Sequence, residues 1–234
     1  EVAEEMATVE LLDERPDAAR AWLDRTLAQP LGQRGLALWA EYFRLREAWA
    51  EGLQWLAARA ASEAAEHAQQ RRAMEAEFSL ALGEEERGMG VLAPLLAGDE
   101  DAVQAGLGVL QRRKLYAKAV DASRAALGRF PENLEIRFAL AAALERRGAA
   151  EEAEKEFRAV LAKDPDNAPS LNYLGYMFAD RGENLAEAKE MIERAVALDP
   201  TSGAFQDSLG WVCYRLGELG LAEKHLTRAA AMEP

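Results

Sequence analysis

The sequence is poor in the side chains that carry redox, metal and nucleophilic chemistry, with one cysteine and two histidines. One thiol cannot form a disulfide within the chain, so cysteine usage leaves the redox compartment open. His67 and His225 have no further ligands at zinc-binding spacing, and no glycine-rich loop follows a strand, so we expect no metal site and no cofactor. Cys213 lies in a predicted helix, twelve residues from His225. We interpret it as a buried packing residue rather than a nucleophile.

Long apolar runs and aromatic residues are also scarce. No run reaches the 18 or more apolar residues that a membrane-spanning helix needs, so we predict no membrane span in this chain. Hydrophobic residues make up 50% of the chain, but aromatic residues make up only 7%. Alanine supplies much of the hydrophobic content that is not aromatic. Alanine favours helices and lets them approach closely. The composition therefore predicts close-packed helices rather than sheets.

The chain has fewer basic residues than acidic ones, 28 against 41, and its net charge is −13. Such a surface repels phosphate backbones, and the short basic clusters lie among acidic neighbours, so we expect no nucleic-acid partner. Acidic runs such as Glu84–Glu86 and Glu151–Glu152 stand at predicted helix starts, where carboxylates favour the helix dipole. We assign no catalytic residues and expect no enzymatic activity.

An internal repeat organises the second half of the chain. Four types of residue recur with one period of 34 or 35 residues: Pro131, Pro165, Pro200 and Pro234; Ala119, Ala153, Ala188 and Ala222; Gly148, Gly182 and Gly217; Leu140, Leu174 and Leu209. Each period holds two helical patterns separated by a glycine, the usual residue for a left-handed turn after a helix. Asn167 and Ser202 stand where they can cap the next helix.

These periods resemble the tetratricopeptide repeat, a 34-residue pair of helices A and B. The match is carried by a Leu-Gly pair in helix A, a turn glycine, and alanine and proline in helix B. One repeat shows it in Leu174-Gly175, Phe178, Gly182, Ala188, Ile192, Ala195 and Pro200, and the next in Leu209-Gly210, Gly217, Ala222, Leu226, Ala229 and Pro234. Cys213 replaces the aromatic residue that Phe178 supplies.

The resemblance implies an all-α fold, a right-handed α-solenoid of stacked helix–turn–helix hairpins. We predict four repeats over 100–133, 134–167, 168–202 and 203–234. Residues 1–99 resemble degenerate hairpins of the same kind, with Gly83 as one turn glycine. The whole chain is then expected to form about seven hairpins in one continuous superhelix.

The resemblance also implies a concave groove lined by helix A. Groove positions spaced by three and four residues share one face of a helix. The predicted partner-binding residues are Arg112, Phe138, Arg146, Asn172, Tyr176, Asp180, Asp207, Trp211, Tyr214 and Arg215. Exposed Trp, Tyr and Arg dominate many protein interfaces. Packing between neighbouring helices is the alternative reading for Trp211 and Tyr214.

Function follows from the resemblance in outline only. We expect a non-enzymatic scaffold or adaptor that binds a partner protein or extended peptide in the groove. The alternatives are a recruiting or regulatory arm of a larger enzyme or protease complex, and a scaffold that forms homo-oligomers through exposed repeat ends. The repeats resemble those of bacterial cell-envelope proteins, which favours a periplasmic or envelope location over a cytoplasmic one. The chain begins at Glu1, so we expect a processed form or a fragment, with any lipid anchor upstream.

Overall fold

The computed structural model of the chain describes residues 2–27, 31–59 and 67–232, and over these ranges it contains fourteen helices and no strand. The first seven are α1 (Val2–Leu12), α2 (Pro16–Thr26), α3 (Gln33–Leu45), α4 (Trp49–Arg59), α5 (Ala68–Ala81), α6 (Glu85–Leu96) and α7 (Glu100–Arg112). The others are α8 (Tyr116–Arg129), α9 (Leu134–Arg146), α10 (Ala150–Lys163), α11 (Ala168–Arg181), α12 (Leu185–Leu198), α13 (Gly203–Arg215) and α14 (Leu219–Met232). The predicted all-α class is confirmed.

The chain divides into two compact units, Glu1–Leu115 and Tyr116–Pro234, which we call the N-unit and the C-unit. The division falls inside the predicted repeat 100–133, between α7 and α8. The continuation of the hairpins as one superhelix stays a prediction.

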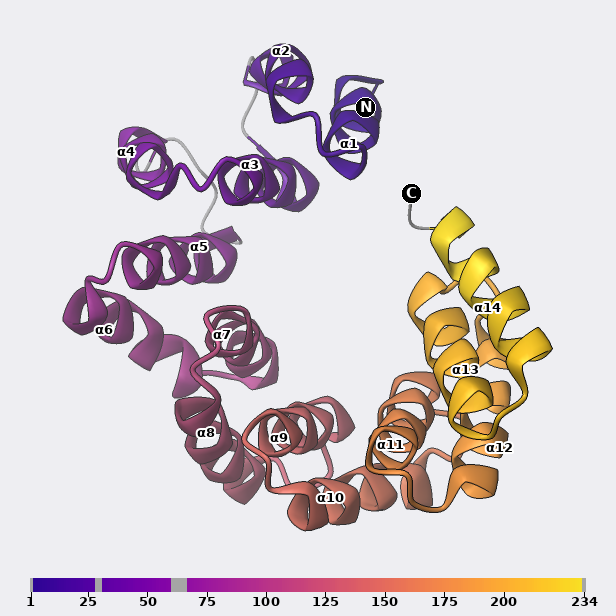
Figure 1. Ribbon diagram of the computed structural model, residues 1–234. Coiled ribbons are helices and arrows are strands. Elements are labelled where there is room, and N and C mark those ends of the chain that lie inside the picture. Colours follow the sequence, from indigo (N-terminus) through magenta and orange to yellow (C-terminus); the bar gives the residue numbers. More distant parts are fainter. Residues whose placement is uncertain (1, 28–30, 60–66, 233–234) are drawn as a thin grey trace. The chain divides into compact units, whose positions relative to one another are not determined.

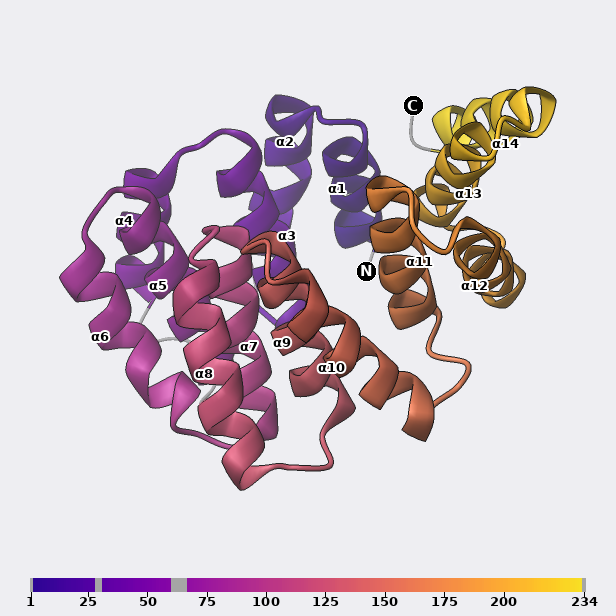
Figure 2. The same cartoon turned by 60° about the horizontal axis from the view of Figure 1, so that its bottom comes forward.

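Odd-numbered helices are the A helices of the hairpins and even-numbered helices are the B helices. Within each unit an A helix packs against its own B helix and against the next A helix, as α5 does with α6 and α7 and α11 does with α12 and α13. Figures 1 and 2 show this order within each unit, with α3, α5 and α7 adjacent in the N-unit and α9, α11 and α13 adjacent in the C-unit. The A helices of a unit therefore share one face, which we call its A-helix face.

One turn geometry recurs after every A helix. The residue in the left-handed conformation is Glu14, Glu47, Gly83, Lys114, Gly148, Gly182 or Gly217. At each turn the next residue donates its N–H to the carbonyl five positions earlier, as Glu183 does to Phe178 and Leu115 does to Leu110, at 2.9 and 2.8 Å. This is the Schellman pattern of helix ends. The four glycines predicted at turns are confirmed, and three charged residues occupy the same position elsewhere.

The recurring residues of the repeat pack where helix A meets helix B. Ala153 and Ala188 are fully buried, and Leu174 is fully buried as well. A side chain at Gly175 would place its Cβ 2.7 Å from Ile192 Cγ1 and 2.9 Å from the Ala188 carbonyl oxygen, so only glycine permits this approach of α11 and α12. The predicted caps are present too, since the side chains of Asn167 and Ser202 accept hydrogen bonds from the N–H groups three residues later. Pro234 lies outside the described residues.

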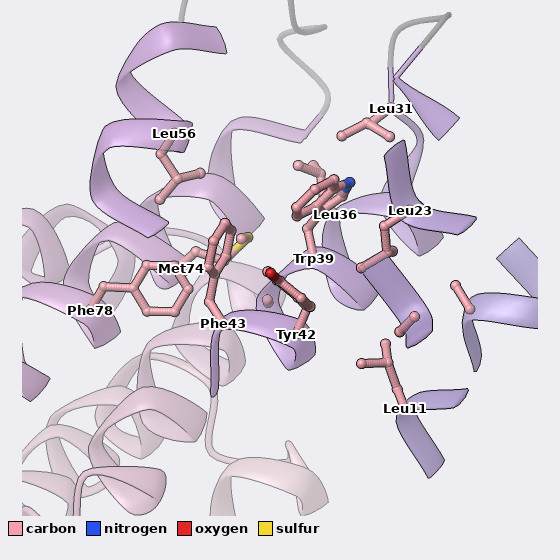
Figure 3. Packing of buried hydrophobic residues seen from close by; sticks show 13 residues of the cluster. Leu11, Leu23, Leu31, Leu36, Trp39, Tyr42, Phe43, Leu56, Met74 and Phe78 are labelled. Atoms are coloured by element: carbon pink, nitrogen blue, oxygen red, sulfur yellow. The ribbon is translucent and has the colours of Figure 1, made fainter. Parts of the chain in front are cut away.

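The interior of the N-unit is built differently, from large aromatic rings (Figure 3). Phe43 of α3 is fully buried, and its ring lies 5.6 Å from that of Trp39 and 5.9 Å from that of Phe78. Trp39 in turn lies 4.9 Å from Trp55 of α4. Rings at these distances bury large areas and prefer tilted or edge-on contacts. Aromatic packing thus holds α3, α4 and α5 together.

Candidate partner-binding faces

Nine of the ten predicted partner-binding residues lie on the A helices of the C-unit, α9, α11 and α13. Arg112 is the exception, because it lies on α7 in the N-unit. The predicted residues therefore belong to both units.

On the C-unit face, Trp211, Tyr214 and Arg215 form one cluster on α13. The Trp211 and Tyr214 rings stack with centroids 5.6 Å apart and an interplanar angle of 23°. The Arg215 guanidinium lies 5.6 Å from the centre of the Trp211 ring, and its Nη1 donates a 2.6 Å hydrogen bond to the carbonyl of Asp180 on α11. Arg215 thus ties the end of α11 to α13, where a cation also favours the helix dipole.

The exposure of these rings differs. Tyr214 is 54% exposed, whereas Trp211 is half-buried and its indole nitrogen is buried without a hydrogen-bond partner. Partner binding by these two residues stays a prediction. Trp211 packs against its neighbours, and Tyr214 presents its ring to solvent.

Tyr176 extends this face onto α11, with 39% of its surface exposed. Burial of the rest of the residue raises the pKa of its phenol, and the charges of Asp180 and Asp207 raise it further. Both aspartates are exposed. The phenol of Tyr176 therefore stays protonated and can donate a hydrogen bond beside two carboxylates.

The remaining predicted residues of the C-unit lie deeper or in other contacts. Asn172 is only 8% exposed, and its Oδ1 has no hydrogen-bond partner. The Phe138 ring is half-buried, 5.7 Å from that of Phe157 and 5.4 Å from that of Tyr173, so it packs between α9, α10 and α11. Arg146 is exposed, next to Glu145 at 3.3 Å.

Cys213 is confirmed as a buried residue of the interior. Burial raises the pKa of its thiol, which favours the protonated form. His225 contacts Gln206 at 2.9 Å, and its pKa is lowered by burial and by Lys224. Among the residues that the structure describes, no group of three or more histidine, cysteine or carboxylate side chains is arranged to hold a metal ion.

The N-unit face centres on Glu77 of α5, a carboxylate with a side chain only 3% exposed. Arg44 of α3 donates to it at 2.9 and 3.1 Å, and Arg112 of α7 donates at 3.0 and 3.1 Å. Burial alone would raise the pKa of Glu77, but the two arginines outweigh it and the pKa is lowered. Three consecutive A helices are thereby joined through one ionised carboxylate.

A cavity of about 680 Å³ opens beside this ion-pair bridge, lined by residues of α3, α5 and α7 and by His67. Arg112 was predicted from its repeat position, but Glu77 and Arg44 were not. The available signal was an acidic residue inside the apolar stretch "AMEAEFSLAL", at a position that faces the interior. A buried carboxylate of this kind requires cationic partners.

Comparison with known proteins gives the class of protein. Models described as tetratricopeptide repeat match residues 110–174 and 178–234, which together make up just over half of the chain. The chain therefore belongs to the tetratricopeptide repeat family. In the general sense of that family it is a protein–protein interaction scaffold. No helix in the described ranges combines the length and apolar character needed to cross a bilayer.

Individual relatives agree with this class. A TPR repeat-containing protein of Pseudomonas aeruginosa is 40% identical over 117 residues, which are 50% of this chain and 20% of that protein. The chain thus spans about a fifth of this relative's length. Two solved structures share the fold. MamA of Desulfovibrio magneticus RS-1 has a TM-score of 0.55 at 22% identity, covering 71% of this chain and 95% of its own. A tetratricopeptide repeat protein of Parabacteroides merdae has a TM-score of 0.61 at 16% identity, covering 99% and 92%.

Proposed function

We propose that the chain is a non-enzymatic adaptor whose C-unit binds a segment of a partner protein on the A-helix face of α9, α11 and α13. The observation that carries this proposal is the aromatic cluster of α13, in which Trp211 orients an exposed Tyr214. A large exposed ring held rigidly loses little conformational entropy on binding. Tyr176 on α11 adds a second exposed ring to the same face.

The charges on this face define the chemistry of the partner. Asp180 and Asp207 are exposed and lie near the Tyr176 phenol. Arg215 is engaged with the Asp180 carbonyl and the Trp211 ring, so it serves to position the cluster. We therefore expect a partner segment with an apolar side chain against Tyr214 and a basic side chain near the two aspartates.

Site-specific photocrosslinking tests the proposal. With p-benzoylphenylalanine at position 214, we expect a discrete crosslinked partner from cells of the source organism. With the same group at exposed Glu190, on helix α12, we expect none. The double variant Tyr176→Ala/Tyr214→Ala should abolish capture of that partner and leave the melting temperature nearly unchanged, because both rings are exposed. Equal capture by this variant and the parent chain contradicts the proposal.

Self-association is a second candidate function, favoured by exposed leucines on α14. Leu219 is 63% exposed, Leu221 42% and Leu226 39%. Apolar side chains grouped on one helix indicate a contact surface, and a second copy of this chain is the partner that we propose. Light scattering should then show a mass that rises with concentration, and Leu219→Lys/Leu221→Lys should remove the rise. A monomer at high concentration rules this function out.

A further inference from the structure

A second cavity of the N-unit lies between α4, α5 and α6, and its volume of about 480 Å³ is within the range of small-molecule sites. Helix α5 packs against both α4 and α6 (Figure 1). Its contribution to the cavity is Ala68, Arg71, Arg72 and Glu75. By the helical period, these residues lie on the side of α5 opposite to those that line the cavity beside the Glu77 bridge. The two cavities are therefore separate sites.

The apolar wall of this cavity comes mainly from α4. Leu53 is half-buried and Leu56 is buried, and the exposed Ala57 continues the wall along the same helix. Ala68, the first residue of α5, completes it. These side chains neither donate nor accept hydrogen bonds, so this wall suits an aliphatic group that is removed from water on binding.

The charged wall carries more positive than negative charge. It consists of Arg71, Arg72 and Glu75 of α5 and Arg87 of α6. Arg87 contacts Glu75 at 3.3 Å and Glu84, outside the cavity, at 3.0 Å. Counting both carboxylates, these described residues retain an excess of one positive charge, in a chain with a net charge of −13. Such a wall favours a ligand with a single negative charge.

The two adjacent arginines of α5 differ in their contacts. Arg71 Nη2 donates to the carbonyl of Leu56 at 3.3 Å. That carbonyl belongs to the last turn of α4, where carbonyls lack a partner in their own helix, so the bond fixes the arginine to α4. Arg72 is exposed and forms no ion pair with any described residue. Its guanidinium can therefore form the two parallel hydrogen bonds that arginine makes with a carboxylate.

From these observations we propose that the cavity between α4, α5 and α6 binds a small amphiphilic anion, an aliphatic chain that ends in one carboxylate. The aliphatic chain lies against Leu53 and Leu56, and the carboxylate pairs with Arg72. Neither part alone is sufficient, because the apolar wall and the charged wall belong to one cavity. The proposal does not depend on the adaptor function of the C-unit, since none of these residues lies in that unit.

NMR titration of the isotope-labelled 234-residue chain with octanoate tests the proposal. We expect octanoate to shift the backbone amide signals of Leu53, Ala68 and Arg72, while those of α12 in the C-unit stay in place. Octan-1-ol has a similar chain without the charge, and acetate has the charge without the chain. Each should bind more weakly than octanoate by about tenfold or more.

Matched variants locate the binding. Arg72→Gln should weaken octanoate binding by about tenfold or more, because the carboxylate loses its partner, whereas Arg124→Gln in the C-unit should not. Ala57→Glu adds a negative charge at the cavity and should weaken binding to a similar extent. Ala58→Glu, at the next exposed position of α4, should have little effect. All four positions are exposed, so each variant should fold, and circular dichroism checks this.

Several results overturn the proposal. One is the absence of shifts at millimolar octanoate, and another is equal binding of octan-1-ol or acetate, which would show that only one wall contributes. Unchanged binding by Arg72→Gln or by Ala57→Glu would place the ligand elsewhere. Shifts of similar size in both units would assign the effect to general detergent action of the aliphatic chain.

Discussion

The two units share one hairpin geometry and fill it with different side chains. In the C-unit, glycine and alanine let helices A and B touch, as at Gly175 against Ala188. In the N-unit, large rings such as Phe43 and Trp39 fill the interior between α3, α4 and α5, and a buried ion pair joins the A helices. The shared element is the left-handed turn with its Schellman hydrogen bond. The two units therefore have the same hairpin architecture, with the same turn and similar helix lengths, although their interior side chains differ.

The largest expected effect on stability comes from removing one ring from the aromatic interior of the N-unit. Phe43→Ala should destabilise the N-unit by about 3–5 kcal/mol, because it removes a fully buried ring and leaves a cavity. Cys213 occupies the equivalent position before its turn in the C-unit, and Cys213→Ala should cost about 1 kcal/mol. Denaturant unfolding is followed by tryptophan fluorescence for the N-unit, which holds four of the five tryptophans, and by circular dichroism for the whole chain. Equal losses in the two variants would contradict the difference in packing.

The buried bridge gives the next largest effect. Glu77→Gln should destabilise the N-unit by about 2–3 kcal/mol, because it leaves Arg44 and Arg112 without their shared carboxylate. Glu132→Gln, which breaks the exposed pair with Lys163, serves as the control and should have no measurable effect. Urea unfolding of each variant provides the free energies.

The same bridge predicts a pH dependence with a definite sign. The folded pKa of Glu77 is lowered below its unfolded value, so its contribution is present above the ordinary carboxyl pKa of about 4.3. That contribution is lost as the pH falls through the lowered folded pKa. The difference in unfolding free energy between the parent chain and Glu77→Gln should therefore be constant near neutral pH and shrink in acid. A difference that grows on acidification contradicts the assignment.

Substitutions at two glycines distinguish the effect of close helix packing on stability from the effect of helix propensity. Gly175→Ala should destabilise the C-unit by about 1–3 kcal/mol, since the new Cβ meets the backbone of α12. Gly90→Ala, in α6 of the N-unit with open space around its Cβ, should stabilise by about 0.5–1 kcal/mol. Thermal unfolding by circular dichroism measures both. The changes in stability of the two variants should have opposite signs, and changes of the same sign would contradict the prediction.

The smallest effect concerns the turns. Lys114 has φ of 56° at the position where Gly148 has φ of 76°. A left-handed conformation is unfavourable for lysine and accessible to glycine, so Lys114→Gly should stabilise the chain by about 0.5–1 kcal/mol. Gly148→Ala should destabilise it by about 1 kcal/mol for the same reason. A loss of stability in Lys114→Gly would show that its side chain makes contacts that outweigh the backbone strain.

The repeat period predicted the hairpins well because its signals are local. Gly182 marks a turn, Asn167 caps a helix, and both roles depend on residues within one turn of the chain. The turns at Glu47 and Lys114 could not be recognised in this way, because packing imposes a backbone conformation that their side chains disfavour. In the candidate site, Tyr176 and Tyr214 were placed correctly on exposed helix faces. Asn172 was expected at the surface and is buried.

The amino-acid sequence by itself determined the class of this protein: its helices, their turns, and which helix of each pair carries aromatic and charged side chains. Periodicity, capping and glycine conformation act over a few residues, so they can be read along the chain. Only the tertiary structure decided which residues share a face. It placed Glu77 between Arg112, 35 residues away in the sequence, and Arg44, 33 residues away, and it gathered four glutamines around one cavity. Such contacts depend on how neighbouring hairpins stack, and local sequence patterns do not predict this stacking.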